Sequence, residues 1–309
     1  MPVFIYPCFE RERSRDTHLV FFDRSKIKMI FLSTFILSPF SFILVFFKFF
    51  MNISLHGKTA LVCGSTKGIG LAVAKKLADA GARIILLARD KQALHRVLHD
   101  IPGEGHFSVV ADFSHPAQLI PAVDEALSQA NHIHILVNNT GGPPGGPLTQ
   151  AEPDAFRQTF NQHLIANHLL MQKLMPGMKA SGYGRIINVI STSVKQPLKG
   201  LGVSNTIRAA VANWAKTLSV ELAPFGITVN NVLPGATDTD RLRGLISAKS
   251  LKSGLSEEEI RNEMLAEIPA ARFAEPDEIA SAVVFLASGQ AAYVNGINLP
   301  VDGGRTSCL

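Results

Sequence analysis

The sequence is poor in tyrosine, tryptophan and cysteine, with three, one and three of them among 309 residues. Cys8, Cys63 and Cys308 lie far apart and are odd in number, which excludes a disulfide framework and indicates a reducing compartment. They form no cluster with the spacing of metal ligands. We therefore expect a cytoplasmic protein that holds no metal.

Charge of either sign is also limited, since charged residues make up 18% of the chain and the formal net charge is +5. Residues 1–50 contain seven Lys/Arg and four Asp/Glu, so +3 belongs to that segment and only +2 to the rest. A nucleic-acid-binding surface needs a concentrated basic face, so we expect no nucleic-acid partner. The hydrophobic content of 47% is ample for a packed core.

One long hydrophobic run begins at Met29 and ends at Phe47, between Lys28 and Lys48. Its nineteen uncharged residues are enough to cross a bilayer as a helix. Two interpretations stay open for this hydrophobic extension, residues 1–50. The sequence from Met51 onward reads as a complete start that leads directly into the first predicted strand, which favours a mis-assigned start upstream. The alternative is a membrane anchor that tethers the protein on its cytoplasmic side.

From residue 51 to 309, short β-branched runs alternate with longer segments of helical period. This alternation predicts a parallel sheet with helices on both faces. No repeat or linker divides the region, so we predict a single doubly wound, Rossmann-type α/β domain with seven parallel strands. The predicted strands are 59–63, 83–88, 107–111, 133–138, 185–190, 227–232 and 297–301, and the predicted helices include 69–80, 116–130, 154–179 and 205–223.

A glycine-rich loop separates the first predicted strand from the first predicted helix. Glycines allow a tight turn and let the backbone approach a pyrophosphate at the positive end of the helix. A strand before the loop and a helix after it are the context that this motif requires. The loop therefore predicts a dinucleotide site at Gly64, Ser65, Thr66, Lys67, Gly68, Ile69 and Gly70.

The end of the second predicted strand indicates which dinucleotide is bound. An acidic residue there would bind the ribose hydroxyls of NAD(H), but Ala88 stands in that position. Arg89 and Lys67 instead offer two cations to a 2′-phosphate, and an arginine can bind it with two hydrogen bonds. We therefore expect NADP(H) rather than NAD(H).

Residues 55–304 resemble the short-chain dehydrogenase/reductase family, in the branch that includes the 3-oxoacyl-ACP reductases. The resemblance rests on the glycine-rich loop, on Asp112, on the Asn-Asn-Thr-Gly run 138–141, on Pro234-Gly235, and on the C-terminal stretch 268–304. It implies roles for the matched positions. These place Asp112 and Phe113 near the adenine, Asn139 and Gly141 along the cofactor, Pro234, Gly235 and Thr239 at the nicotinamide end, and Thr237 as a second hydroxyl in that loop.

The resemblance also implies a catalytic set of a serine, a tyrosine about thirteen residues later, a lysine four beyond that, and a helix asparagine. Ser191 matches the serine, but Ser204, Arg208 and His163 stand at the other three positions. A serine hydroxyl cannot ionise as a tuned phenol can, and an arginine stays protonated. Our hypothesis is that Ser191 and Ser204 polarise a carbonyl while His163 supplies the proton through water. The alternative is that His163 is a buried histidine with a satisfied hydrogen bond.

Two functions are compatible with these residues. The first is an NADPH-dependent reductase of a ketone or 3-oxoacyl thioester, with residues 240–267 as a lid and residues 141–147 facing the same pocket. The second is a catalytically silent NADP(H)-binding sensor or scaffold, which the changes at Ser204 and Arg208 favour. The resemblance further implies a homo-oligomer, either a dimer or a tetramer.

Overall fold

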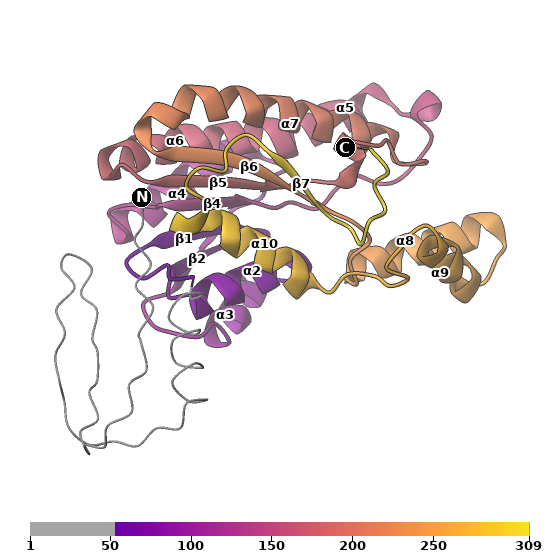
Figure 1. Cartoon of the computed structure of the whole chain (residues 1–309), viewed down its shortest axis with the longest axis horizontal. Helices are drawn as coiled ribbons and strands as arrows, with labels where there is room; N and C mark the ends of the chain where they lie inside the picture. Colours follow the sequence, from indigo (N-terminus) through magenta and orange to yellow (C-terminus); the bar gives the residue numbers. More distant parts are fainter. Residues whose placement is uncertain (1–52, 309) are drawn as a thin grey trace, which may run out of the picture. The chain divides into compact units, whose positions relative to one another are not determined.

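The computed structural model describes residues 53–308, and their centre is one parallel sheet (Figure 1). The strand order is β3-β2-β1-β4-β5-β6-β7, and every neighbouring pair runs parallel. The predicted seven-stranded doubly wound α/β fold is therefore confirmed. The strands are β1 (Thr59–Cys63), β2 (Arg83–Ala88), β3 (Phe107–Val110), β4 (Ile135–Asn138), β5 (Gly184–Val189), β6 (Ile227–Pro234) and β7 (Asn298–Val301).

Helices cover both faces of the sheet because alternate strand residues point to opposite sides. In β1, Val62 packs toward one face and Leu61 toward the other, and both side chains are fully buried. The Val62 face is covered by α2 (Gly68–Asp79), α3 (Lys91–His99) and α10 (Pro276–Ala287). The Leu61 face is covered by α4 (Leu119–Gln129), α6 (Ala166–Ser181) and α7 (Gly202–Leu222), as Figure 1 shows.

The predicted helix over residues 154–179 is wrong in one respect. The structure divides it into α5 (Pro153–Phe160), a π-helical turn, η3 (Asn161–Ile165), and α6. A π turn is a local insertion that hydrophobic periodicity does not report, and such turns often mark functional sites. The predicted strand boundaries differ from the observed ones by one or two residues at several ends, as expected where strands fray into loops.

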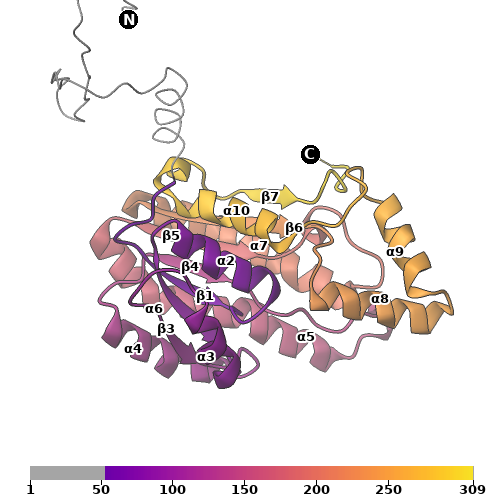
Figure 2. The same ribbon diagram turned by 90° about the horizontal axis from the view of Figure 1, so that it is seen from below.

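Two further helices, α8 (Asp240–Ser253) and α9 (Glu257–Ala266), lie on the side of the sheet toward which β7 points (Figure 2). They have a small core of their own, which contains Leu242, Ile246 and Ile260. Both helices begin at a side-chain cap: Thr239 accepts a hydrogen bond from the Leu242 amide, and Ser256 forms a capping box. The predicted lid is thus a compact helical hairpin.

The hydrophobic run 29–47, which was predicted as a possible anchor, lies outside the described residues. Within residues 53–308, no helix combines the length and the apolar character that a bilayer span requires.

A row of asparagine side chains crosses four neighbouring strands. Asn138 donates to Asn188, Asn188 to Asn231, and Asn231 to Asn298, each over 2.8 Å. The same residues are paired in the sheet register, so the side-chain row runs beside the backbone hydrogen bonds. Because a slip of one residue would break every bond in the row, it fixes the register of β4 to β7.

Asn188 in the middle of this row should be sensitive to truncation. Asn188→Ala removes both of its bonds and leaves buried polar atoms of Asn138 and Asn231 without partners. We expect the free energy of unfolding to fall by about 2–4 kcal/mol, measured by urea denaturation. The matched control is Asn213→Ala, at an exposed position of α7, which should change it by less than about 0.5 kcal/mol. Equal stabilities of the two variants would show that the row carries no stability.

Candidate active site

The sheet has a topological switch point between β1 and β4. The chain leaves β1 toward β2 on one side, while β4 pairs with β1 on the other. Ligands of open α/β sheets bind in the crevice that such a divergence leaves at the carboxyl ends of the strands. The loops after β1 and β4 flank this point, and they contain the glycine-rich segment and Asn139.

The glycine-rich loop is packed too tightly for any side chain at two positions. A Cβ atom on Gly70 would lie 2.1 Å from the Gly64 carbonyl oxygen, and one on Gly64 would lie 2.5 Å from the Asn139 carbonyl oxygen. Gly64 also has a φ of +58°, which favours glycine. The Asn139 side chain donates to the carbonyls of Cys63 and Gly64 over 3.3 and 3.4 Å. Asn139 thereby fixes the loop from the neighbouring strand.

The first turn of α2 presents free backbone N–H groups to this loop. Its N-cap, Lys67, is exposed and makes no side-chain cap, and no acidic residue lies in the first turn. These groups and the helix dipole favour an anion. Ser65 is fully buried, and its hydroxyl donates to the Leu87 carbonyl over 3.4 Å, which ties the loop to the end of β2. Thr239 closes the other side, since its methyl carbon would lie 3.1 Å from a Cβ on Gly68.

Arg89 and Asp112 lie at the carboxyl ends of β2 and β3, where the adenosine end of a dinucleotide was predicted. Arg89 is exposed, and Asp112 is half-buried and accepts a hydrogen bond from the Ser114 amide over 2.9 Å. Burial alone would raise the pKa of Asp112, but its hydrogen bonds with Ser114 and the charge of Arg89 lower it below the ordinary value. Phe113 is half-buried against the core under β3. The two charged side chains are thus close enough to interact.

The loop after β6 connects the sheet to α8. The Gly235 amide donates to the Val301 carbonyl over 2.9 Å, which ties the loop to β7. Thr237 is 6% exposed and donates to the Gly235 carbonyl over 3.2 Å. Thr239 donates to the Thr237 carbonyl and caps α8. Pro234 and Gly235 are half-buried at the end of β6, on the same edge of the sheet as the glycine-rich loop.

The carboxyl edge of the sheet also holds three residues of the predicted catalytic set, Ser191 after β5 and Ser204 and Arg208 on α7. Ser191 follows β5 and accepts a hydrogen bond from the Ser193 amide over 3.1 Å. Ser204 and Arg208 lie one turn apart on α7, and each is only 7% exposed. Arg208 donates to the Val189 carbonyl, next to the end of β5, over 3.3 Å. Burial and the charge of Arg241 lower the pKa of Arg208 to about 10, so its guanidinium stays charged at neutral pH.

His163 lies in the π turn, is 3% exposed, and shares a hydrogen bond of 2.7 Å between its Nδ1 and the Thr140 hydroxyl. Its Nε2 is buried and has no partner within residues 53–308. Burial, Arg208 and Arg241 lower its pKa to about 3, and the nearby Gly141 backbone opposes this shift. The ring is therefore neutral near pH 7, with one nitrogen satisfied and the other not.

Two residues of the site were given no role of their own in the sequence prediction. Thr140 fixes His163, and Arg241 on α8 donates to the carbonyls of Gly142 and Pro143 over 2.9 and 3.4 Å. Arg241 thus joins α8 to the loop after β4. The sequence signal for Arg241 was its place two residues after Thr239, but nothing in the sequence places its side chain against residue 142.

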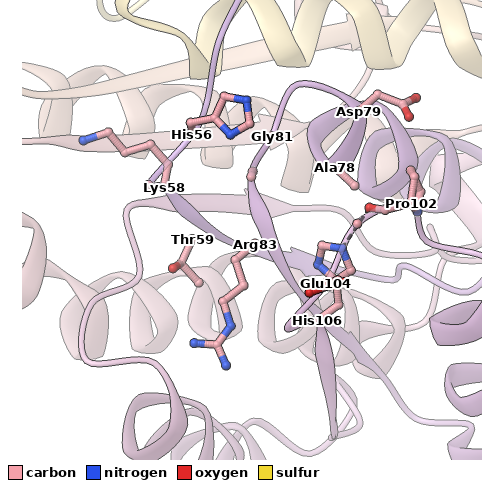
Figure 3. Close-up of a pocket in the computed structure, with 13 residues that line it drawn as sticks. His56, Lys58, Thr59, Ala78, Asp79, Gly81, Arg83, Pro102, Glu104 and His106 are labelled. Carbon is pink, nitrogen blue, oxygen red and sulfur yellow. Dashed lines mark hydrogen bonds between the residues drawn. The ribbon is translucent and has the colours of Figure 1, made fainter.

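A cavity of about 570 Å³ lies elsewhere (Figure 3). It opens at the opposite, amino-terminal edge of β1 and β2, near Thr59 and Arg83. Two of its polar side chains are already bonded: His106 accepts from the Ile84 amide and pairs with the Pro102 carbonyl, and Arg83 donates to the Gly105 carbonyl. We therefore place the chemistry at the carboxyl edge.

Known proteins agree with this geometry. A family model described as enoyl-(acyl carrier protein) reductase matches residues 64–306, which include all of the loops described above. The chain belongs to the short-chain dehydrogenase/reductase family. It is 33% identical over 253 residues to the 3-oxoacyl-(acyl-carrier-protein) reductase FabG of Vibrio cholerae, covering 81% of this chain and 98% of the relative.

Two other family members are named with their cofactor. The NADPH-dependent reductase BacG of Bacillus subtilis is 29% identical over 256 residues, with 82% of this chain and 99% of the relative covered. The structure of L-sorbose reductase from Gluconobacter frateurii, solved with NADPH and L-sorbose, superposes with a TM-score of 0.80 at 32% identity, and covers 84% of this chain and all of that one. The predicted family resemblance is thus confirmed.

The neutral state of His163 has a consequence for stability against acid. In the unfolded chain His163 takes up a proton below its ordinary pKa of 6.5, whereas the folded chain resists it down to about 3. The contribution of His163 to the free energy of unfolding therefore falls as the pH falls from 6.5 toward 3. At pH 5 this contribution is about 2 kcal/mol lower than at pH 7.5. Urea denaturation at the two pH values measures how much unfolding free energy is lost on acidification. We expect this loss to be smaller by about this amount in His163→Asn than in the wild type.

The control is His95→Asn, at an exposed position of α3, which leaves His163 in place and should retain the wild-type loss. An unchanged acid dependence in His163→Asn would contradict the low pKa.

Proposed function

We propose that this protein is an NADP(H)-dependent oxidoreductase of the short-chain family that transfers hydride between NADPH and a ketone or 3-oxoacyl group. The observation that carries the proposal is the convergence of four loops, after β1, β4, β5 and β6, at one edge of the sheet, with a rigid anion cradle in the first. The names of the relatives, reductases and dehydrogenases, favour an enzyme over a silent sensor. As in other members of the family, we expect a homo-oligomer.

The choice of NADP(H) rests on the residues around the end of β2. Ala88 cannot bind ribose hydroxyls as an acidic residue would, and Arg89 and Lys67 are both exposed beside the loop. When bound, the cofactor supplies the hydride. The residues that would hold it are Gly64, Ser65, Thr66, Lys67, Gly68, Ile69, Gly70, Arg89, Asp112, Phe113, Asn139, Gly141, Pro234, Gly235, Thr237 and Thr239.

Carbonyl reduction also requires a proton and stabilisation of the developing negative charge on oxygen. Ser191 and Ser204 are the hydroxyl donors that would polarise the carbonyl, and the Ser204 hydroxyl has no hydrogen-bond partner in the described part of the chain. Arg208 contributes fixed positive charge without exchanging its proton.

The proton would come from water through His163. Because the ring is neutral, it can act as a relay, taking a proton at one nitrogen while it releases one from the other. Thr140 at Nδ1 holds the ring orientation for this role.

Cofactor preference can be tested at Arg89. Arg89→Ala should weaken NADPH binding by about 10- to 100-fold, because a charged hydrogen-bond pair with the 2′-phosphate is lost, and leave NADH binding unchanged. Fluorescence titration of both dinucleotides measures this. Arg96→Ala, at an exposed position of α3, is the control and should bind NADPH like the wild type. Equal losses for NADPH and NADH would refute the assignment of Arg89 to the 2′-phosphate.

The catalytic assignment can be tested at Ser191. On a panel of 3-oxoacyl thioesters and simple ketones, Ser191→Ala should lower kcat by about 10²-fold or more, since one donor to the developing oxyanion is removed. NADPH binding should not change. Ser281→Ala removes an exposed hydroxyl of α10 and should keep wild-type kcat. Wild-type turnover in Ser191→Ala would exclude this serine from the chemistry.

A further inference from the structure

Two arginine side chains from different helices meet at the loop after β4. Arg208 belongs to α7 and Arg241 to α8, and both point at Gly142. A Cβ atom placed on Gly142 would lie 2.6 Å from the Arg241 Nη2 and 3.4 Å from the Arg208 Nη2. Because both distances start from one point, the two Nη2 atoms are at most about 6 Å apart. The absence of a side chain at Gly142 leaves room for this approach.

No acidic side chain balances this pair within residues 53–308. Neither Arg208 nor Arg241 takes part in any ion pair there. Arg243, two residues further along α8, differs because it is paired with two carboxylates. Asp238 and Asp240 lie 2.8 and 2.6 Å from its guanidinium nitrogens. Two like charges close together, one of them buried, are unfavourable unless an anion joins them.

Both guanidinium groups also keep donors to spare. A guanidinium carries five N–H donors. Arg208 uses one nitrogen on the Val189 carbonyl, and Arg241 uses two on the carbonyls of Gly142 and Pro143. Backbone carbonyls are neutral acceptors, so an oxyanion would be the stronger partner for the remaining N–H groups.

His163 gives a second and independent sign of a missing ligand. It lies close enough to Arg208 and Arg241 for both charges to act on it. Its ring is 3% exposed, and its Nε2 has no hydrogen-bond partner in the described residues. A buried polar atom without a partner is costly, and such atoms are normally satisfied by protein, water or ligand. The cluster therefore combines two unpaired cations with an unused hydrogen-bonding nitrogen.

From this arrangement we infer that Arg208 and Arg241 bind an oxyanion group, a carboxylate or a phosphate, carried by the carbonyl substrate. The inference rests on the proposed function, because it assigns a substrate class to the same site. The cofactor phosphates have other cations and donors at the α2 N-terminus, Lys67 and Arg89, whereas Arg208 and Arg241 come from α7 and the lid. Arg241 would exchange its backbone partners for the anion and so hold the lid against the substrate.

The test is a calorimetric titration of the full chain, saturated with NADP⁺, with three probes of similar shape. Benzoate and phenyl phosphate carry the two oxyanions, and benzamide is the neutral counterpart of benzoate. We expect an anionic probe to bind at least tenfold more tightly than benzamide, and the stronger of the two anions names the group. Arg241→Gln should abolish this preference. Arg243→Gln, on the same helix but paired with its own aspartates, should retain it.

Three results would overturn the inference. The first is equal binding of benzoate, phenyl phosphate and benzamide by the wild type, and the second is an anion preference that survives in Arg241→Gln. The third is binding of the anionic probe to the cofactor-free chain that is lost when NADP⁺ is added, which would assign the arginines to the cofactor. If NADP⁺ itself does not bind, the proposed function fails. In that case the same titration of the cofactor-free chain tests the anion site by itself. The preference for an anionic probe over benzamide, and its loss in Arg241→Gln, can be measured without the cofactor.

Discussion

The parallel direction of all seven strands is the constraint on which the site depends. Because every strand runs the same way, all of the connecting loops that follow them emerge at one edge. The glycine-rich loop, Asn139, Ser191 and Pro234 are separated by many residues in the chain but are brought to this edge by the sheet alone. The asparagine row keeps the four strands β4 to β7 in register, so the relative heights of these loops are fixed as well.

Electrostatics distinguish the two ends of this edge. On the side of β2 and β3, Arg89 is exposed to solvent and has Asp112 nearby, so its charge is screened and shared. On the side of β5 and α7, Arg208 is buried and faces Arg241 instead of a carboxylate. Burial, together with the positive field of these two arginines, keeps His163 neutral. An environment of this kind stabilises negative charge, whether it belongs to a bound group or develops during reaction.

The fold was readable from the sequence because its signals are local. Runs such as 84–88 are apolar throughout, as strands buried on both faces must be, and the glycines at 64 and 68 mark a turn with positive φ angles. The π turn was not readable, since one extra residue in a helix leaves the apolar spacing on each side intact. Likewise, the seven predicted strands follow from short β-branched runs in the sequence, but the row of asparagines requires knowing which strands are neighbours.

The site was predictable only as far as its positions match a family motif. Ser191, Ser204 and Arg208 could be located by counting along the chain, and the structure places them at the carboxyl edge of the sheet. Which residue each of these side chains contacts could not be predicted from the motif. That Arg241 reaches Gly142, or that Thr140 holds His163, depends on the packing of the lid and of the π turn, which involves residues up to 99 positions apart.

The π turn at Asn161–Ile165 gives the long helical segment two rotational phases. One added residue turns everything beyond it by about 100° around the helix axis. The face of α6 that packs against the sheet is therefore oriented independently of the face of the helix on which His163 lies. Side chains of α5 therefore lie on a different face from the one that packs against the core after the turn. The segment is one continuous helical stretch in which α5 and α6 present differently oriented faces.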